Sequence, residues 1–585
     1  MKYPTLSVPQ SNRRMVDLFK GYNHNLRIGD GEFYDMKNMT SDYYPVLSPR
    51  GKRGVYTTQG SAQGLIAKDA LCYVDGSDFV INEYHVEMNL STKAEDCPKT
   101  LVSMGAYVII MPDRKYINTL DLEDFGSIDA TFTTTQDVTF TLCTIDGASY
   151  DNPVVSAVEP SNPQNLALWI DTSSTPHSLK QYSSASAMWV SIATTYIKIS
   201  STGIGKAFSQ YDGVTISGVL ADSLQSLNNT MPIWACDDNY IVVVGILDAV
   251  TTQTKAEGAI TISRKMPNVD FITESENRLW GCRYGMAANG DVVNEIYACK
   301  LGDFKNWNCF MGLSTDSYAA SCGTDGQFTG AITHLGYPLF FKETCVHKVF
   351  GNFPSNYQIQ TTACRGVEKG SERSLAIVNE VLYYKARHAV CAYDGSLPTE
   401  VSAAFGDLRY GNAVAGAHGN KYYISMADGA NHHHMFVYDT AKGMWHKEDD
   451  LHAGAFCSCR EELYCIDQDT GHIITMLGSG TPETEAVEWM AETGNLYMTW
   501  PDMKYIPRML VRMSLDIGSV VKFYAQYDLS DEWIELCTMK GTNLRSFSVP
   551  IRPRRCDHMK LRIVGTGMGK IYSITKTIEQ GSDRS

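Results

Sequence analysis

Three consecutive histidines, His432, His433 and His434, are the residues whose type and spacing most suggest chemistry, because imidazole is a common metal ligand. Successive side chains of a β-strand point to opposite faces, so at most two of the three could bind one ion. We therefore interpret this run as a polar hairpin tip. The alternative is a metal site in which two of the three histidines bind one ion.

Two further groups of residues could also carry chemistry. Asp30-Gly31-Glu32 could supply paired carboxylates, but no second acid, histidine or nucleophile accompanies them at a useful spacing, and we interpret them as a turn. Cys457, Cys459 and Cys465 fall on one predicted hairpin, where a zinc site is the alternative to free thiols. The 16 cysteines lack regular spacing and any Cys-x-x-Cys pair, which predicts mostly free, buried thiols made in a reducing cytoplasm.

The usual catalytic motifs are missing from the sequence. It contains no Ser-x-Asp-x-Gly-x-x-Trp turn of sugar-cleaving propellers, no Gly-x-Ser-x-Gly elbow, no His-Glu-x-x-His pair and no phosphate-binding loop. We therefore expect a chain that is not an enzyme and that needs no cofactor and no metal. An active site assembled from distant loops is the alternative.

Composition predicts a folded, mostly β protein. Of 585 residues, 44% are hydrophobic and 11% aromatic, with 33 tyrosines, which favour strands. The net charge of −15 argues against a nucleic-acid binder that neutralises phosphates with Lys and Arg. An acidic surface could still line a passage for DNA, or simply confer solubility. No apolar run reaches the roughly 20 residues of a membrane span.

A loosely repeated unit of short strands recurs about every 40 residues, the spacing of β-propeller blades. Each copy consists of an apolar strand, a turn, a second apolar or aromatic strand and a polar loop. Copies begin near Leu65, Leu101, Ile272, Ile332, Leu375, Ala413 and His452.

The pattern divides the chain into five parts and predicts an all-β fold. We expect an extended N-terminal arm over residues 1–54, first propeller blades over 55–130, an inserted β-barrel or sandwich over 131–265, the remaining blades over 266–478, and a C-terminal β-sandwich over 485–580.

Three segments in this order resemble a family of bacteriophage structural proteins, the tail nozzle or packaged-DNA stabilisation proteins of short-tailed phages. The first is the arm, with Phe19-Lys20-Gly21-Tyr22-Asn23 and a later run that ends in Ser48-Pro49-Arg50. The second lies in the blades, with Asn277-Arg278-Leu279-Trp280-Gly281 and Phe340-Phe341-Lys342-Glu343. The third is Pro550-Ile551-Arg552-Pro553-Arg554-Arg555-Cys556-Asp557-His558.

This resemblance implies a structural virion protein of a phage tail, made in the host cytoplasm. Such a protein would form a homohexameric ring below the portal and adaptor proteins, and would retain and then conduct genomic DNA without sequence-specific binding. The basic residues expected at its interfaces, for which solvated charge is the alternative, are Arg13, Arg14, Lys20, Arg27, Arg50 and Arg53 toward a neighbouring subunit, and Arg552, Arg554 and Arg555 toward an acidic partner. The alternative function is a host-attachment propeller that binds or cleaves surface glycans.

Overall fold

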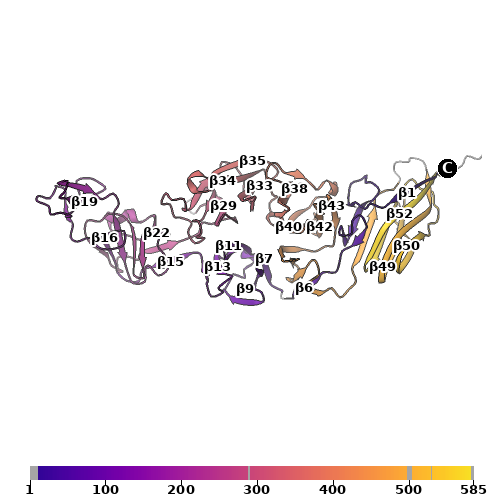
Figure 1. The fold of residues 1–585 in the computed structure, drawn as a ribbon, viewed down its shortest axis with the longest axis horizontal. Helices are drawn as coiled ribbons and strands as arrows, with labels where there is room; N and C mark the ends of the chain where they lie inside the picture. Colours follow the sequence, from indigo (N-terminus) through magenta and orange to yellow (C-terminus); the bar gives the residue numbers. More distant parts are fainter. Residues whose placement is uncertain (1–10, 59, 288–289, 497–502, 529, 581–585) are drawn as a thin grey trace, which may run out of the picture. The chain divides into compact units, whose positions relative to one another are not determined.

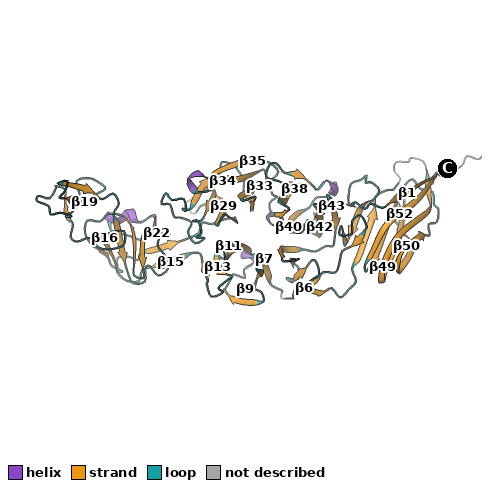
Figure 2. Cartoon of the chain, viewed as in Figure 1, coloured by secondary structure: helices purple, strands orange, loops and turns teal. Residues whose placement is uncertain are grey.

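The computed structural model describes residues 11–58, 60–287, 290–496, 503–528 and 530–580. Strands dominate, and the helices in these ranges are short 3-10 turns, of which Asp222–Leu227 is the longest (Figure 2). No helix in the described ranges is both long and apolar enough to cross a membrane. The prediction of an all-β propeller fold is confirmed.

The chain forms two compact units. The first consists of Met1–Leu101, Phe340–Val346 and Thr362–Ser585, and the second of Val102–Leu339 and His347–Thr361.

Blade-like groups of four or five strands follow one another in the first unit, and one of them, β40 to β43, is part of a larger twelve-stranded sheet. Their strands are β7 (Ala62–Lys68), β8 (Ala70–Asp75), β9 (Asp78–Ile81) and β10 (Tyr84–Glu87); β36 (Ala376–Val378), β37 (Val381–Ala386), β38 (Ala389–Tyr393) and β39 (Thr399–Glu400); β40 (Gly411–His418), β41 (Lys421–Ala427), β42 (His433–Asp439) and β43 (Met444–Lys447); and β44 (Ala453–Cys459), β45 (Glu462–Asp467) and β46 (Ile473–Thr475). The last sheet is completed by β6 (Gly54–Thr57) and β47 (Thr481–Pro482). A strand from the N-terminal segment therefore closes the final blade.

Three more four-stranded sheets fall mainly in the second unit. They consist of β11 (Thr100–Met104), β12 (Tyr107–Met111), β13 (Lys115–Asn118) and β14 (Phe125–Ser127); β28 (Phe271–Ser275), β29 (Arg278–Met286), β30 (Val292–Ala298) and β31 (Tyr318–Ser321); and β32 (Phe328–His334), β33 (Tyr337–Lys342), β34 (Cys345–Phe350) and β35 (Gln358–Ala363). Trp280, Tyr318 and Tyr357 pack edge to face or tilted, with ring centroids 5.0 to 6.0 Å apart. Large rings thus fill the space between adjacent sheets.

The inserted segment of the second unit forms three small sheets. Their strands are β15 (Ala130–Thr133), β27 (Thr261–Arg264), β22 (Gly213–Ser217) and β23 (Thr230–Pro232); β24 (Ala235–Asp237), β25 (Tyr240–Val244), β21 (Tyr196–Ser200), β16 (Val138–Cys143) and β26 (Thr251–Gln253); and β17 (Val154–Ser156), β18 (Leu168–Asp171), β19 (Ser178–Ser183) and β20 (Met188–Ser191). Phe140 and Ile199 of the second sheet share a buried core with Val214 and Ile262 of the first. The first two sheets therefore form a sandwich.

The C-terminal strands of the first unit form a large antiparallel sheet that bends over its own core. They are β48 (Glu488–Thr493), β49 (Lys504–Tyr527), β50 (Ile534–Val549), β51 (Met559–Thr566) and β52 (Gly569–Gln580). The first half of β49 pairs with β52 and the second half with β51, while β50 pairs along both halves. Figure 1 shows β49, β50 and β52 in this sheet. Alternate residues of β49, such as Met509, Val511 and Phe523, are fully buried.

The N-terminal arm is woven into these sheets. β1 (Ser11–Val16) pairs with β52, and β2 (Gly21–Tyr22) joins β43 to β3 (Glu32–Lys37), which pairs with β48. β4 (Met39–Thr40) and β5 (Ser48–Pro49) pair with each other before β6 enters the last blade. The arm thus connects the C-terminal sheet to the blades of the same unit.

Candidate functional site

A cavity of about 580 Å³ lies beside the arm in the first unit. Its apolar wall consists of Val16, Phe19, Phe33, Met509, Leu561 and Ile574. Its polar wall contains Arg14, Arg27, Asp30, Glu32 and Lys576. A cavity of this size with an apolar wall and a few convergent charges has the character of a binding site.

Strand register places Arg14 of β1 and Lys576 of β52 on the cavity side. Arg14 pairs with Lys576 and Val16 with Ile574, and directly paired residues of antiparallel strands share a face. The predicted turn at Asp30-Gly31 is present, and it places the carboxylates of Asp30 and Glu32 at the cavity, where the sequence was not expected to build a site. A glycine is required at Gly31, because its φ is 92° and an added Cβ would lie 2.2 Å from the carbonyl oxygen of Leu18.

Asp30 and Glu32 of the cavity form hydrogen bonds with other residues of the chain, whereas Arg14 and Arg27 form no ion pair within the part of the chain that the structure describes. Lys576 is 3% exposed, and its Nζ donates to Asp30 Oδ1 at 2.6 Å. Burial lowers the pKa of Lys576, with Arg14 adding to the effect, while Asp30 opposes both. Glu32 Oε2 accepts a hydrogen bond from the Gly29 backbone N–H at 2.6 Å.

Arg14 and Arg27 are exposed and have no ion-pair partner among the described residues. Their uncompensated charge next to an apolar wall favours an anionic group that carries an apolar body. The structure thus brings together two of the predicted interface residues, Arg14 and Arg27. Lys576 was missed, and Asp30 was interpreted only as part of a turn, because their pairing depends on a strand contact between distant parts of the chain.

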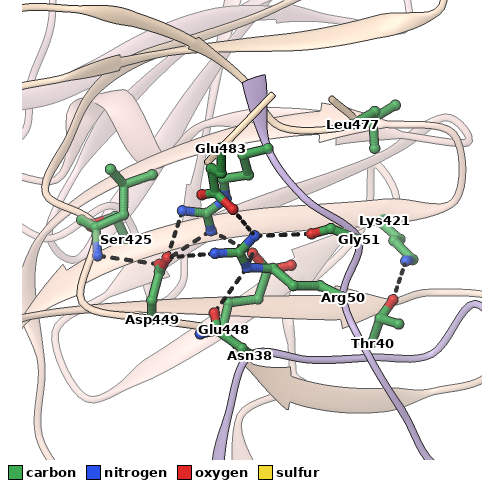
Figure 3. A network of polar contacts seen from close by, with 12 residues as sticks. Asn38, Thr40, Arg50, Gly51, Lys421, Ser425, Glu448, Asp449, Leu477 and Glu483 are labelled. Atoms are coloured by element: carbon green, nitrogen blue, oxygen red, sulfur yellow. Dashed lines mark hydrogen bonds and ion pairs between the residues drawn. The ribbon is translucent and has the colours of Figure 1, made fainter. Parts of the chain in front are cut away.

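Arg50 and Arg53 lie in a different place, inside a buried ionic network (Figure 3). Arg53 donates to Glu448 Oε2 at 2.5 Å and to Asp449 Oδ2 at 2.6 Å. Arg50 donates to Asn38 Oδ1 at 2.8 Å, with Asp449 and Glu483 at 3.3 and 3.4 Å.

This burial corrects the prediction that Arg50 and Arg53 reach a neighbouring subunit. The two residues are 8% and 4% exposed, and their carboxylate partners belong to the same unit. Although burial alone would raise it, the pKa of Asp449 is lowered by Arg53 and Arg50. The network ties the arm to the blades.

The other predicted interface residues are exposed and scattered. Arg13 lies on the outer side of β1, and Lys20 lies between β1 and β2. Arg552, Arg554 and Arg555 lie in the loop between β50 and β51, where the Arg554 guanidinium is 5.5 Å from the centre of the Tyr527 ring. Contact of these residues with a partner stays a prediction.

The histidine run lies at the hairpin between β41 and β42, and His452 joins it. His434 contacts Asp428 and Asp450, each at 3.3 Å, and the rings of His433 and His452 stack at 3.6 Å. Within the described ranges, no group of three or more His, Cys, Asp or Glu side chains is arranged to hold a metal ion. Cys457, Cys459 and Cys465 are free thiols.

Comparisons with known proteins return only distant structural similarity. No family model matches the chain, and no curated protein matches it. An exo-beta-1,3-galactanase from Phanerochaete chrysosporium shows 9% identity and a TM-score of 0.22 over 52% of this chain and 94% of its own. Trypanosoma rangeli sialidase shows 8% identity and a TM-score of 0.22 over 97% of this chain and 96% of its own. The extracellular domain of a putative hybrid two-component system from B. thetaiotaomicron shows 11% identity and a TM-score of 0.23 over 92% of this chain and 98% of its own.

These comparisons correct one expectation from the sequence, that the chain is not an enzyme. A galactanase and a sialidase are among the solved structures to which the chain is similar, and we withdraw that expectation on this finding. Matches at this identity and TM-score assign no activity to the chain.

Proposed function

We propose that this protein is a structural subunit of a bacteriophage tail, which assembles with copies of itself into a ring below the portal and adaptor proteins. The observation that carries the proposal is the cavity beside the arm, where Arg14 and Arg27 have no ion-pair partner among the described residues and lie next to an apolar wall. The resemblance of the arm and blades to tail nozzle proteins supports the same function.

A neighbouring subunit or adaptor protein would supply the missing partner of this cavity. A segment with carboxylates would neutralise Arg14 and Arg27, and its apolar side chains would cover Phe19, Phe33 and Leu561. The ring would enclose a channel for the genome. A net charge of −15 would keep DNA from adhering to the channel wall.

The proposal is tested by the mass of the purified protein in solution, alone and with the portal and adaptor proteins encoded beside it. The double variant Arg14→Glu, Arg27→Glu should reduce assembly at least tenfold, because it places acids where acids are expected to bind. Arg387→Glu changes another exposed arginine and is the matched control. Equal assembly of all three proteins would show that the cavity does not mediate contact.

A second candidate function, binding of surface glycans during host attachment, is favoured by one feature of the inserted segment. Trp169, Tyr182 and Trp189 share one face of the β18–β20 sheet, with ring centroids 5.4 Å apart at each contact with Trp189. Lys180 lies 4.7 Å from the centre of the Trp169 ring and pairs with Asp171 at 2.7 Å. Aromatic faces flanked by charged groups can stack on sugar rings and bond to their hydroxyls.

A glycan array with the intact protein tests this second function. Trp189→Ala should abolish any glycan signal, whereas Met188→Ala should preserve it, because adjacent strand residues point to opposite faces. A signal that survives Trp189→Ala would place glycan binding elsewhere.

A further inference from the structure

The first unit contains another cavity, which we call the basic cavity, with a volume of about 220 Å³. It is lined by residues of the β37–β38 hairpin, of β39 and of the segment around the 3-10 turn Ala403–Phe405. It shares no lining residue with the cavity beside the arm. The charged and titratable residues of its wall are Arg365, Lys385, Arg387, His388, Glu400 and Arg409. Four basic side chains thus gather in a chain whose net charge is −15.

A tight hairpin and a glycine turn bring these residues to one place. Lys385 of β37 pairs with Val390 of β38, and Arg387 and His388 form the two-residue turn between the strands. The 3-10 turn is followed by Gly406, whose φ is 59° and where an added Cβ would lie 2.9 Å from a backbone oxygen. A glycine is therefore required just before the loop that carries Arg409.

Lys385 supplies a buried positive charge. It is 4% exposed, and its Nζ donates to the Ala386 carbonyl at 2.5 Å and to Glu368 Oε2 at 3.0 Å. Burial lowers the pKa of Lys385, with Arg409 adding to the effect, while Glu368 opposes both. The ammonium and the Arg409 guanidinium are therefore close enough to repel each other, and an anion between them would relieve that repulsion.

The three arginines of the basic cavity retain unused hydrogen-bond donors. Arg409 donates only through Nη1, to the carbonyls of Gly406 and Leu408 at 3.1 and 3.0 Å, and forms no ion pair in the described ranges. The Arg387 side chain has no hydrogen bond or ion pair with any described residue. Arg365 Nη1 bonds to Glu400 Oε2 at 2.9 Å, but these side chains are 64% and 41% exposed, so the pair is weak.

The charge balance of the basic cavity favours an anion with two negative charges. Glu400 on the wall and Glu368 beside Lys385 compensate two of the four cations, and two positive charges remain if His388 is neutral. Asp407 is in the same loop as Arg409 but does not line the cavity. A phosphate group carries about two negative charges at neutral pH, whereas a carboxylate carries one.

The size of the basic cavity and the shape of its donors agree with this charge. Its volume of about 220 Å³ is below the range of drug-sized ligands, which begins at about 300 Å³, so it suits one small group. Guanidinium groups bind phosphate oxygens through two parallel hydrogen bonds.

We propose that the basic cavity binds one dianionic phosphate group, either free phosphate or the monoester at the end of a larger molecule, through the guanidiniums of Arg365, Arg387 and Arg409. Lys385 adds its charge from behind the wall, because its own donors are already used. This site is additional to the proposed ring function. Since the two cavities have no residue in common, phosphate binding and ring assembly can fail independently.

Isothermal titration calorimetry of the full-length protein with inorganic phosphate tests this site. The buffer contains no sulfate and is held above the second pKa of a phosphate group. Arg409→Gln and Arg365→Gln should each raise the dissociation constant about tenfold or more, because each removes charge-assisted hydrogen bonds. Arg460→Gln removes the same charge from an exposed arginine of the β44–β45 turn, outside the basic cavity, and should leave the constant unchanged.

The choice of anion tests the charge argument. Sulfate, which has the same shape and charge, should compete with phosphate, whereas acetate should not. Competition by a 5′-phosphorylated oligonucleotide, but not by its unphosphorylated form, would identify the ligand as a monoester end, and binding of phosphate without that competition would identify free phosphate. No binding of phosphate at millimolar concentrations, equal binding of acetate, or unchanged affinity in folded Arg365→Gln and Arg409→Gln proteins would overturn the proposal.

Discussion

The backbone of Gly54 pairs with that of Thr475, so a strand near the start of the chain completes the last blade. The fit is close, because an added Cβ at Gly54 would lie 2.5 Å from Thr475 Oγ1 and 2.8 Å from the backbone nitrogen of Gly480. Closure of a propeller by strands from both ends of the chain makes the arm part of the fold.

Gly54→Ala should therefore lower the free energy of unfolding by about 1–3 kcal/mol through overpacking of this pairing. Urea denaturation followed by tryptophan fluorescence measures the effect. Gly51→Ala is the control, because no atom lies within 4 Å of an added Cβ there, and its change should stay within about 0.5 kcal/mol. Equal midpoints for the two variants would refute the close fit at Gly54.

The network around Asp449 predicts loss of stability in strong acid. The pKa of Asp449 in the folded protein lies below its ordinary value of 3.8, because Arg53 and Arg50 outweigh the effect of burial. A depressed carboxyl pKa contributes stability above the unfolded pKa, and this contribution is lost as pH falls through the folded pKa. The free energy of unfolding should thus fall below about pH 4, and Asp449→Asn should weaken that dependence. An unchanged acid dependence in Asp449→Asn would show that other carboxyls cause it.

His446 predicts a second, separate pH dependence. It is 4% exposed, and burial, with a contribution from Lys421, lowers its pKa from 6.5 to about 3. Between these values the unfolded chain binds a proton that the folded chain does not. The free energy of unfolding should therefore decrease as pH falls from 6.5 to 4, by at most about 1.4 kcal/mol per pH unit.

Denaturant titrations between pH 7 and pH 4 measure this slope. His446→Gln should flatten it, while Asp449→Asn should leave it unchanged above pH 4.5. A slope that persists in a folded His446→Gln protein would assign it to other histidines, such as those near His452.

Local patterns sufficed to predict the propeller, because the strands of one blade pair with their sequence neighbours. Tyr383 of β37 and Tyr422 of β41 lie in consecutive blades about 40 residues apart, and both are buried. The arm could not be predicted in this way, since β1 pairs with residues 574–579 and β6 with residues 473–475. Such pairings leave no local signal.

The candidate site could likewise be predicted only in part from the sequence. Basic residues in the arm pointed to Arg14 and Arg27, but sequence alone could not separate them from Arg50 and Arg53. The difference lies in Glu448, Asp449 and Glu483, distant acids that the fold places around only one of the two pairs. Burial by remote segments decides which cations remain available to a partner.

The mass of the unmodified protein by light scattering after size exclusion, alone and with its portal and adaptor proteins, tests the ring most directly. We predict a mass several times the 64.9 kDa of one chain, either alone or on that complex. A particle of 64.9 kDa that ignores the complex under both conditions would contradict the account.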